Sequence, residues 1–88
     1  MTLIEVELFT TPGNNAVIRL PGRRFPGVVI QGDTLHSVVM TTSEALSALM
    51  QGDTSTAQEL LQESVEQLRD AQERYETALQ EHGLALPY

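Results

Sequence analysis

The chain has 88 residues, of which 41% are hydrophobic, and it carries a formal net charge of −7 with no cysteine and no lysine. This length and composition are typical of one small folded domain spanning residues 1–88, and they argue against disorder. The absence of cysteine excludes disulfides, thiolate catalysis and cysteine-based zinc sites, so we expect a cytoplasmic protein.

The start of the chain predicts neither a targeting segment nor a membrane anchor. The opening residues, MTLIEVELF, contain no basic residue of the kind that begins a secretory signal. No apolar run approaches the roughly 18 residues of a membrane-spanning helix. We therefore expect no membrane partner.

Charge is distributed unevenly along the chain. Residues 1–40 carry three acidic and three basic side chains, whereas residues 41–88 carry nine acidic side chains against Arg69 and Arg74. Because an acidic surface repels phosphate backbones, we expect no extended nucleic-acid partner. A compact anionic ligand at the neutral half stays compatible with this distribution.

Two alternating segments at the start of the chain predict a β-hairpin. Residues 3–9, LIEVELF, alternate apolar residues with glutamates, and residues 15–20, NAVIRL, alternate again after the turn TTPGNN. The pattern assigns Val17 and Arg19 of the second strand to the polar face, together with the glutamates of the first strand. The buried face then carries Ile4, Val6 and Leu8 of the first strand and Ala16, Ile18 and Leu20 of the second. We expect Arg19 to pair with a glutamate of the first strand.

A loop and a third strand follow. Residues 21–27, PGRRFPG, have a Pro-Gly pair at each end, which predicts a short and stiff turn. Residues 28–31, VVIQ, are continuously apolar up to the glutamine and predict a third strand.

Residues 32–50 allow two interpretations. In the first, Asp33 caps a helix that runs from about Thr34 to Met50. In the second, residues 35–40 form a fourth strand, and a helix begins at the capping box in residues 41–44. Helical spacing over sixteen residues favours the first, whereas the β-branched residues favour the second. The apolar face of the helical interpretation contains Leu35, Val38, Val39, Thr42, Leu46, Leu49 and Met50.

The strongest pattern in the chain is a long amphipathic helix over residues 54–82, which Gly83 ends. The segment Gln51–Thr54 ends the preceding helix and caps this one. About 28 helical residues span roughly 42 Å, longer than a compact body of this size, so we expect a homo-oligomer, most simply a dimer. The predicted fold is α+β, a three-stranded antiparallel sheet followed by a helical hairpin with a long C-terminal helix.

Two groups of residues are candidates for ligand binding. The first group is an arginine cluster with an aromatic neighbour, in which guanidinium groups bind phosphate or carboxylate and a ring stacks on a base. The second group offers backbone amides at a helix start. Their members are Arg19, Arg23, Arg24 and Phe25 in the first group, and Gly32, Asp33, Thr34 and His36 in the second. Strand 28–31 separates the groups by about 15 Å, so one small ligand would contact both only across a subunit interface.

Each group also has a purely structural interpretation. The arginines of the loop would then be solvated or paired with the acidic helix, and Asp33 would serve only as a helix cap. His36, with Asp33 nearby, offers a general base, but no catalytic triad spacing, HExxH motif or calcium loop accompanies it. We expect no catalytic residue, no metal and no cofactor. His82 suits the negative end of the long helix, which is a structural role.

Residues 23–35, RRFPGVVIQGDTL, resemble the hallmark of a family of small bacterial proteins without assigned function. The opening strand, the segment AVIRLPG and the ending LALPY resemble that family as well. The resemblance implies a shared fold and no activity. A weaker similarity, in size and in the lack of catalytic motifs, links the chain to phage proteins that sequester nucleotide immune signals.

These observations lead to two functional hypotheses. In the first, the chain is a non-enzymatic protein that captures a small anionic ligand, such as a nucleotide immune signal in an anti-defence role, through the arginine loop near an oligomer interface. In the alternative, it is a protein-interaction module, such as an immunity or accessory protein, that uses its acidic long helix.

Overall fold

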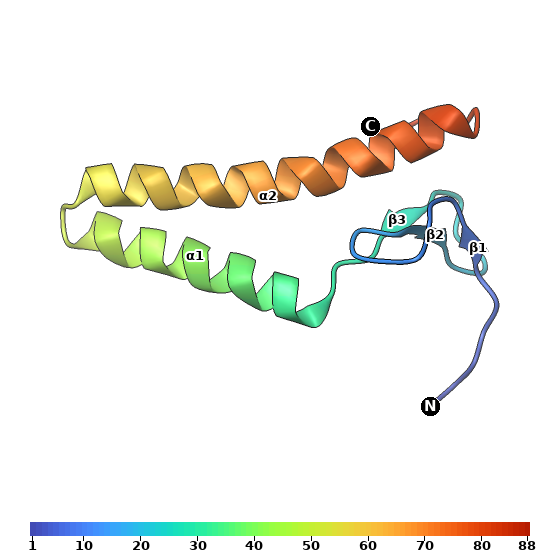
Figure 1. Ribbon diagram of the computed structural model, residues 1–88, viewed down its shortest axis with the longest axis horizontal. Helices are drawn as coiled ribbons and strands as arrows, with labels where there is room; N and C mark the ends of the chain where they lie inside the picture. Colours follow the sequence, from blue (N-terminus) through green and yellow to red (C-terminus); the bar gives the residue numbers. More distant parts are fainter. The chain divides into compact units, whose positions relative to one another are not determined.

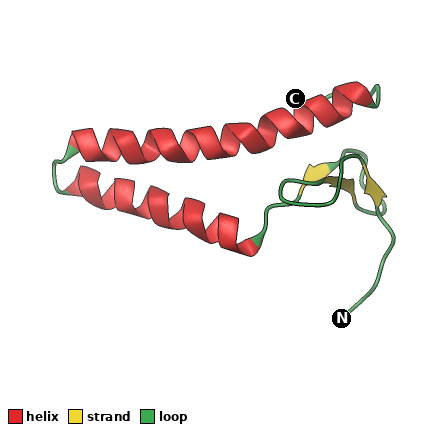
Figure 2. Ribbon diagram, viewed as in Figure 1, coloured by secondary structure: helices red, strands yellow, loops and turns green.

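The computed structural model describes residues 1–88 (Figure 1). Its elements are β1 (Glu7–Leu8), β2 (Val17–Arg19), β3 (Gly27–Val28), α1 (Gly32–Met50) and α2 (Thr54–Glu81). The predicted α+β fold is confirmed, since a three-stranded antiparallel sheet precedes two helices, of which the second is long (Figure 2). Neither helix contains an apolar stretch long enough to cross a membrane.

The structure divides into two compact units. The first, which we call the sheet unit, consists of Met1–Ile30 together with Ala71–Tyr88. The second, the hairpin unit, consists of Gln31–Asp70. Helix α2 contributes to both units along its length. That they form a single domain stays a prediction.

The three strands are shorter than the alternating segments that predicted them. They pair in the order β1-β2-β3, and Glu7 lies opposite Arg19. Continuing this register would bring Glu5 opposite Pro21, which has no amide hydrogen to donate, so the β1–β2 ladder stops. On the other side, Asn15 has a φ of 62°, outside the extended region, and this ends the pairing of β2 with β3.

The prediction of which sheet face is buried was wrong. Val17, assigned to the polar face, is fully buried and forms the core of the sheet unit with Tyr75, Ala78 and Leu79 of α2. Phe9, Val28, Leu84 and Leu86 pack around this core. Of the residues assigned to the buried face, Ala16 is buried, whereas Leu8 and Leu20 are each 46% exposed. The helix covers the face that carries Val17 and Phe9, and the charged residues on that face, Glu7 and Arg19, neutralise each other at its edge.

Helix α1 confirms the helical interpretation of residues 34–50 and excludes a fourth strand. The prediction that Asp33 caps this helix was wrong, because the N-cap is Gln31, whose carbonyl accepts the Leu35 amide at 2.9 Å. Gln31 has the extended backbone that an N-cap requires, so the helix begins at Gly32. Asp33 therefore lies in the first turn, where its Oδ1 accepts the Thr34 amide at 2.8 Å.

The predicted link between the helices is confirmed. Gly52, with a φ of 79°, ends α1, and the Asp53 amide donates back to the Ala48 carbonyl at 2.9 Å. Asp53 then caps α2, since its Oδ1 accepts the Thr56 amide at 3.2 Å. Hydrogen bonds from Thr56 lower the pKa of Asp53. The two helices run antiparallel on either side of this turn (Figure 1).

The predicted end of α2 is also confirmed. Gly83 has a φ of 68°, and the Leu84 amide donates to the Leu79 carbonyl at 2.9 Å, which closes the last turn. The Nδ1 atom of His82 lies 2.8 Å from the Ala78 carbonyl oxygen, and its ring meets Phe9 edge-on at 5.0 Å. His82 thus has the structural role that its position predicted.

Candidate functional site

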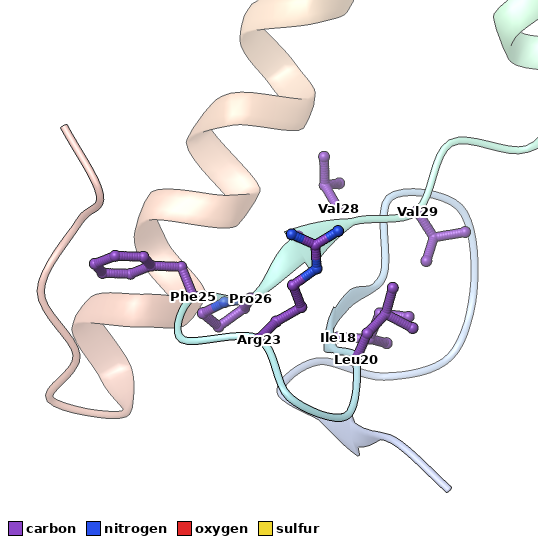
Figure 3. Close-up of a pocket in the computed structure, with 8 residues that line it drawn as sticks. Ile18, Leu20, Arg23, Phe25, Pro26, Val28 and Val29 are labelled. Carbon is purple, nitrogen blue, oxygen red and sulfur yellow. The ribbon is translucent and has the colours of Figure 1, made fainter. Parts of the chain in front are cut away.

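A pocket of about 430 Å³ is formed by β2, β3 and the loop that joins them (Figure 3). Its volume falls in the range of small-molecule sites, roughly 300–1,000 Å³. The wall is mostly aliphatic, with a single charged side chain. The lining residues are Ile18, Leu20, Arg23, Phe25, Pro26, Gly27, Val28 and Val29.

Two anchors hold the loop that forms one side of the pocket. At its start, the Arg23 amide donates to the Leu20 carbonyl at 3.2 Å across a turn. Pro21 fixes φ in that turn and Gly22 adopts a φ of 76°, the combination that a type II turn requires. At the end of the loop, the buried Tyr75 hydroxyl donates to the Pro26 carbonyl at 2.8 Å. The loop is therefore tied both to β2 and to α2.

The three clustered arginines have three different environments. Arg19 donates from Nε and Nη2 to the two carboxylate oxygens of Glu7, each at 2.8 Å, which confirms the predicted ion pair. This bidentate contact lowers the pKa of Glu7 and raises the pKa of Arg19. The guanidinium of Arg24 lies 5.2 Å from the centre of the Phe25 ring. Arg23 has no acidic partner and lines the pocket.

Figure 3 shows how Arg23 lies in the pocket. In this view its side chain extends toward β3, with Val28 above the guanidinium and with Ile18 and Leu20 below it and to the right. The ring of Phe25 points away from these aliphatic side chains. The arrangement presents one cation at the edge of an apolar wall. It can neutralise an anionic group and at the same time bury an apolar body.

The other predicted binding residues lie in the hairpin unit, in the first two turns of α1. Gly32, Asp33 and His36 are exposed, and Thr34 is half-buried. None of the four lines the pocket. The Asp33 carboxylate already accepts the Thr34 amide, and its negative charge disfavours an anion at this helix start. The structure therefore brings Arg23 and Phe25 to one pocket and leaves the helix-start residues outside its lining.

Sequence reasoning missed the aliphatic wall and the tyrosine anchor. Ile18 and Leu20 alternate correctly but were assigned to the interior, so they were not considered as pocket residues. Tyr75 belongs to the apolar stripe of the long helix, and that periodicity alone predicts only a buried ring. A tyrosine within such a stripe signals a buried hydroxyl that needs an acceptor, and this signal pointed to a polar tether.

A family model matches residues 1–88, so the chain belongs to the family of unknown function (DUF6959). Searches of curated proteins and of solved structures found no match to this chain. This membership agrees with the expectation that the chain belongs to a family without assigned function. The similarity to phage proteins that sequester nucleotide signals stays a prediction.

Proposed function

We propose that this chain is a non-enzymatic binding protein that captures a small ligand with one anionic group and an apolar body. The observation that carries the proposal is the unpaired guanidinium of Arg23 at the edge of an aliphatic pocket. Of the three arginines in the cluster, it is the one engaged neither by a carboxylate nor by an aromatic ring.

The pocket selects for a ligand that combines both properties. A guanidinium binds carboxylate or phosphate through two parallel hydrogen bonds. In solvent such a pair alone contributes little, because water screens it. The walls formed by Ile18, Leu20 and Val29 add binding free energy by burying the apolar surface of a ligand. A small inorganic anion has no apolar surface and does not gain this contribution. Nucleotides, which join a phosphate to a flat ring, are the first class to test.

The lining residues favour binding over catalysis. They offer no carboxylate, imidazole, hydroxyl or thiol side chain that would act as a nucleophile or a general base. The Tyr75 hydroxyl is committed to the Pro26 carbonyl and holds the loop in place. A pocket held from both sides loses little conformational freedom when it binds, which benefits affinity.

The test is a thermal-shift screen of mononucleotides, cyclic nucleotides and aromatic carboxylates, with inorganic phosphate as the ligand without an apolar body. A ligand present at roughly 100 times its Kd adds about 2.7 kcal/mol to the free energy of unfolding. We expect stabilisation by an amphipathic anion and none by phosphate. Arg23→Gln should remove the stabilisation, and the control Arg24→Gln should keep it. If no compound shifts Tm, or if both variants respond like the wild type, the proposal is wrong.

A second function, a protein-interaction module, has one observation in its favour. The hairpin-unit part of α2 carries a stripe of exposed acidic side chains at Glu59, Glu63, Glu66 and Asp70. A basic partner would be attracted to this stripe. Replacing these four residues by glutamine would then abolish co-purification with a host protein, whereas Arg23→Gln would not. Retention of the partner by the glutamine variant would exclude this function.

A further inference from the structure

Small side chains form the contact between α1 and α2 in the hairpin unit. Ala45, Ala48, Ala57 and Ser64 are buried there, at 8% exposure or less. The hydroxyls of Thr42 and Ser64 lie 3.0 Å apart across the two helices. Small residues let helices approach closely, but they bury little apolar surface. The contact between α1 and α2 therefore buries few of the large hydrophobic residues of the hairpin unit.

The large hydrophobic residues form a second row on each helix. Leu46, Leu49 and Val65 each directly follow a buried small residue, so they lie about 100° further around their helices. The other large residues lie on the same sides by helical spacing. Their exposed fractions range from 43% to 59%. We call this set the leucine–valine face, and its members are Leu35, Val39, Leu46 and Leu49 on α1 and Leu61, Val65 and Leu68 on α2. The apolar face predicted for α1 thus exists, but the structure places most of it away from α2.

Both rows lie on the same side of the hairpin. When two helices are antiparallel, an offset of one residue in the same chain direction turns both rows toward the same side of the pair. A shallow groove of about 440 Å³ joins the two rows near the turn between the helices, since Leu49 of α1 and both Leu61 and Val65 of α2 line it. The two rows of the leucine–valine face therefore point to the same side of the hairpin and meet near its turn.

We propose that a second copy of this chain covers the leucine–valine face, so that two hairpins form a four-helix bundle. Seven half-exposed side chains offer on the order of 100 Å² each, or roughly 700 Å² per protomer, close to the roughly 800 Å² that one partner contributes to a standard interface. A two-fold axis pairs such a face with itself, which is the commonest arrangement in homo-oligomers. Four-helix bundles pack apolar rows of this spacing in their cores.

The charge distribution favours a second copy over a charged partner. None of the seven residues of the face is ionisable, although the chain carries a net charge of −7. The acidic residues Glu59, Glu63, Glu66 and Asp70 form a separate row more than 100° away around α2, and they are exposed. Two identical acidic chains can meet at this face without bringing their carboxylates together. A basic partner would instead be drawn to the acidic row.

Sedimentation and light scattering test the proposal on the full chain. We expect the wild type to have about twice the 9.7 kDa chain mass. Leu46→Glu on α1 and Leu61→Glu on α2 should each give a monomer whose far-ultraviolet circular dichroism stays helical. Met40→Glu is the matched control, because Met40 is 45% exposed on α1 but lies off the face, and this variant should remain a dimer.

The milder variants Leu46→Gln and Leu61→Gln decide the result if a glutamate variant loses its helical signal. Each should raise the Kd of the dimer at least tenfold, while Met40→Gln should leave this Kd unchanged. A wild type that stays monomeric up to roughly 1 mM, where binding weaker than about 4 kcal/mol escapes detection, overturns the proposal. So does an assembly larger than a dimer, a dimer that survives all the substitutions on the face, or one that Met40→Glu disrupts equally.

Discussion

Removing one hydroxyl, with Tyr75→Phe, tests how the pocket loop is held. In the folded chain this hydroxyl donates to the Pro26 carbonyl at 2.8 Å, and both residues are buried. Phenylalanine keeps the ring and its packing against Ala78 and Leu79. The variant therefore removes a hydrogen bond and leaves the Pro26 carbonyl without its donor, while the shape of the core is unchanged.

The unpaired Pro26 carbonyl determines how much stability the variant loses. A hydrogen bond contributes a net of about 0.5–1.5 kcal/mol, whereas a buried acceptor without a partner costs about 1–3 kcal/mol. We expect Tyr75→Phe to lower the free energy of unfolding by about 2 kcal/mol. For a chain of this length each kcal/mol shifts Tm by about 4–8 °C, so Tm should fall by roughly 8–16 °C.

Thermal melts followed by circular dichroism at one fixed protein concentration measure the effect. The control is Tyr88→Phe, the same chemical change at a side chain that is 67% exposed and makes only a 3.4 Å contact with Gln72. It should stay within about 0.5 kcal/mol of the wild type. If Tyr75→Phe also stays within that limit, the hydroxyl does not hold the loop, and the reasoning about the second anchor is refuted.

Two further predictions concern the same core. Burial raises the pKa of Tyr75 above its ordinary value, so the unfolded chain releases this proton at lower pH than the folded chain. The unfolded state then binds fewer protons above about pH 10, and denaturant titrations should show stability falling as pH rises there, with a smaller fall in Tyr75→Phe; equal slopes would contradict this. Leu79→Ala, at a fully buried side chain, should lower the free energy of unfolding by about 2–5 kcal/mol, while Leu3→Ala, 86% exposed, should change it by less than about 0.5 kcal/mol. Similar Tm values for these two variants would show that α2 does not seal the core of the sheet unit.

The helices were predictable where the periodic pattern was long, and the limits of local sequence appear in one repeated tetrapeptide. The residues Gln-Gly-Asp-Thr occur at 31–34 and again at 51–54. Before the first copy the backbone is extended, so Gln31 is the cap and Gly32 is helical. Before the second copy the backbone is helical, so Gly52 takes a positive φ and Asp53 caps the next helix. The same four residues adopt two structures because the conformation of the preceding segment determines where the next helix begins.

The candidate site was predictable only in part, for a related reason. The sequence places Arg23 in a group of four candidates with Arg19, Arg24 and Phe25, and it predicts the ion pair that engages Arg19. It does not reveal which sheet face stays open, because both faces of β2 carry apolar residues: Val17 on one, Ile18 and Leu20 on the other. The choice depends on which face receives α2, a contact made across more than fifty residues of chain.

The distribution of side-chain size explains why this chain leaves two apolar surfaces open. Its only large and fully buried side chains are Val17 and Leu79, and the helix contact in the hairpin unit uses alanine and serine. A chain of this length that buries mainly small residues gains little from its own core, and small domains often compensate by associating. Pairing at the leucine–valine face would supply that burial in the hairpin unit, and Tm would then rise with protein concentration. The variants at Tyr75 and Leu79 would differ in Tm from the wild type by the same amount at any fixed concentration. This comparison distinguishes the stability of the sheet unit from that of the dimer.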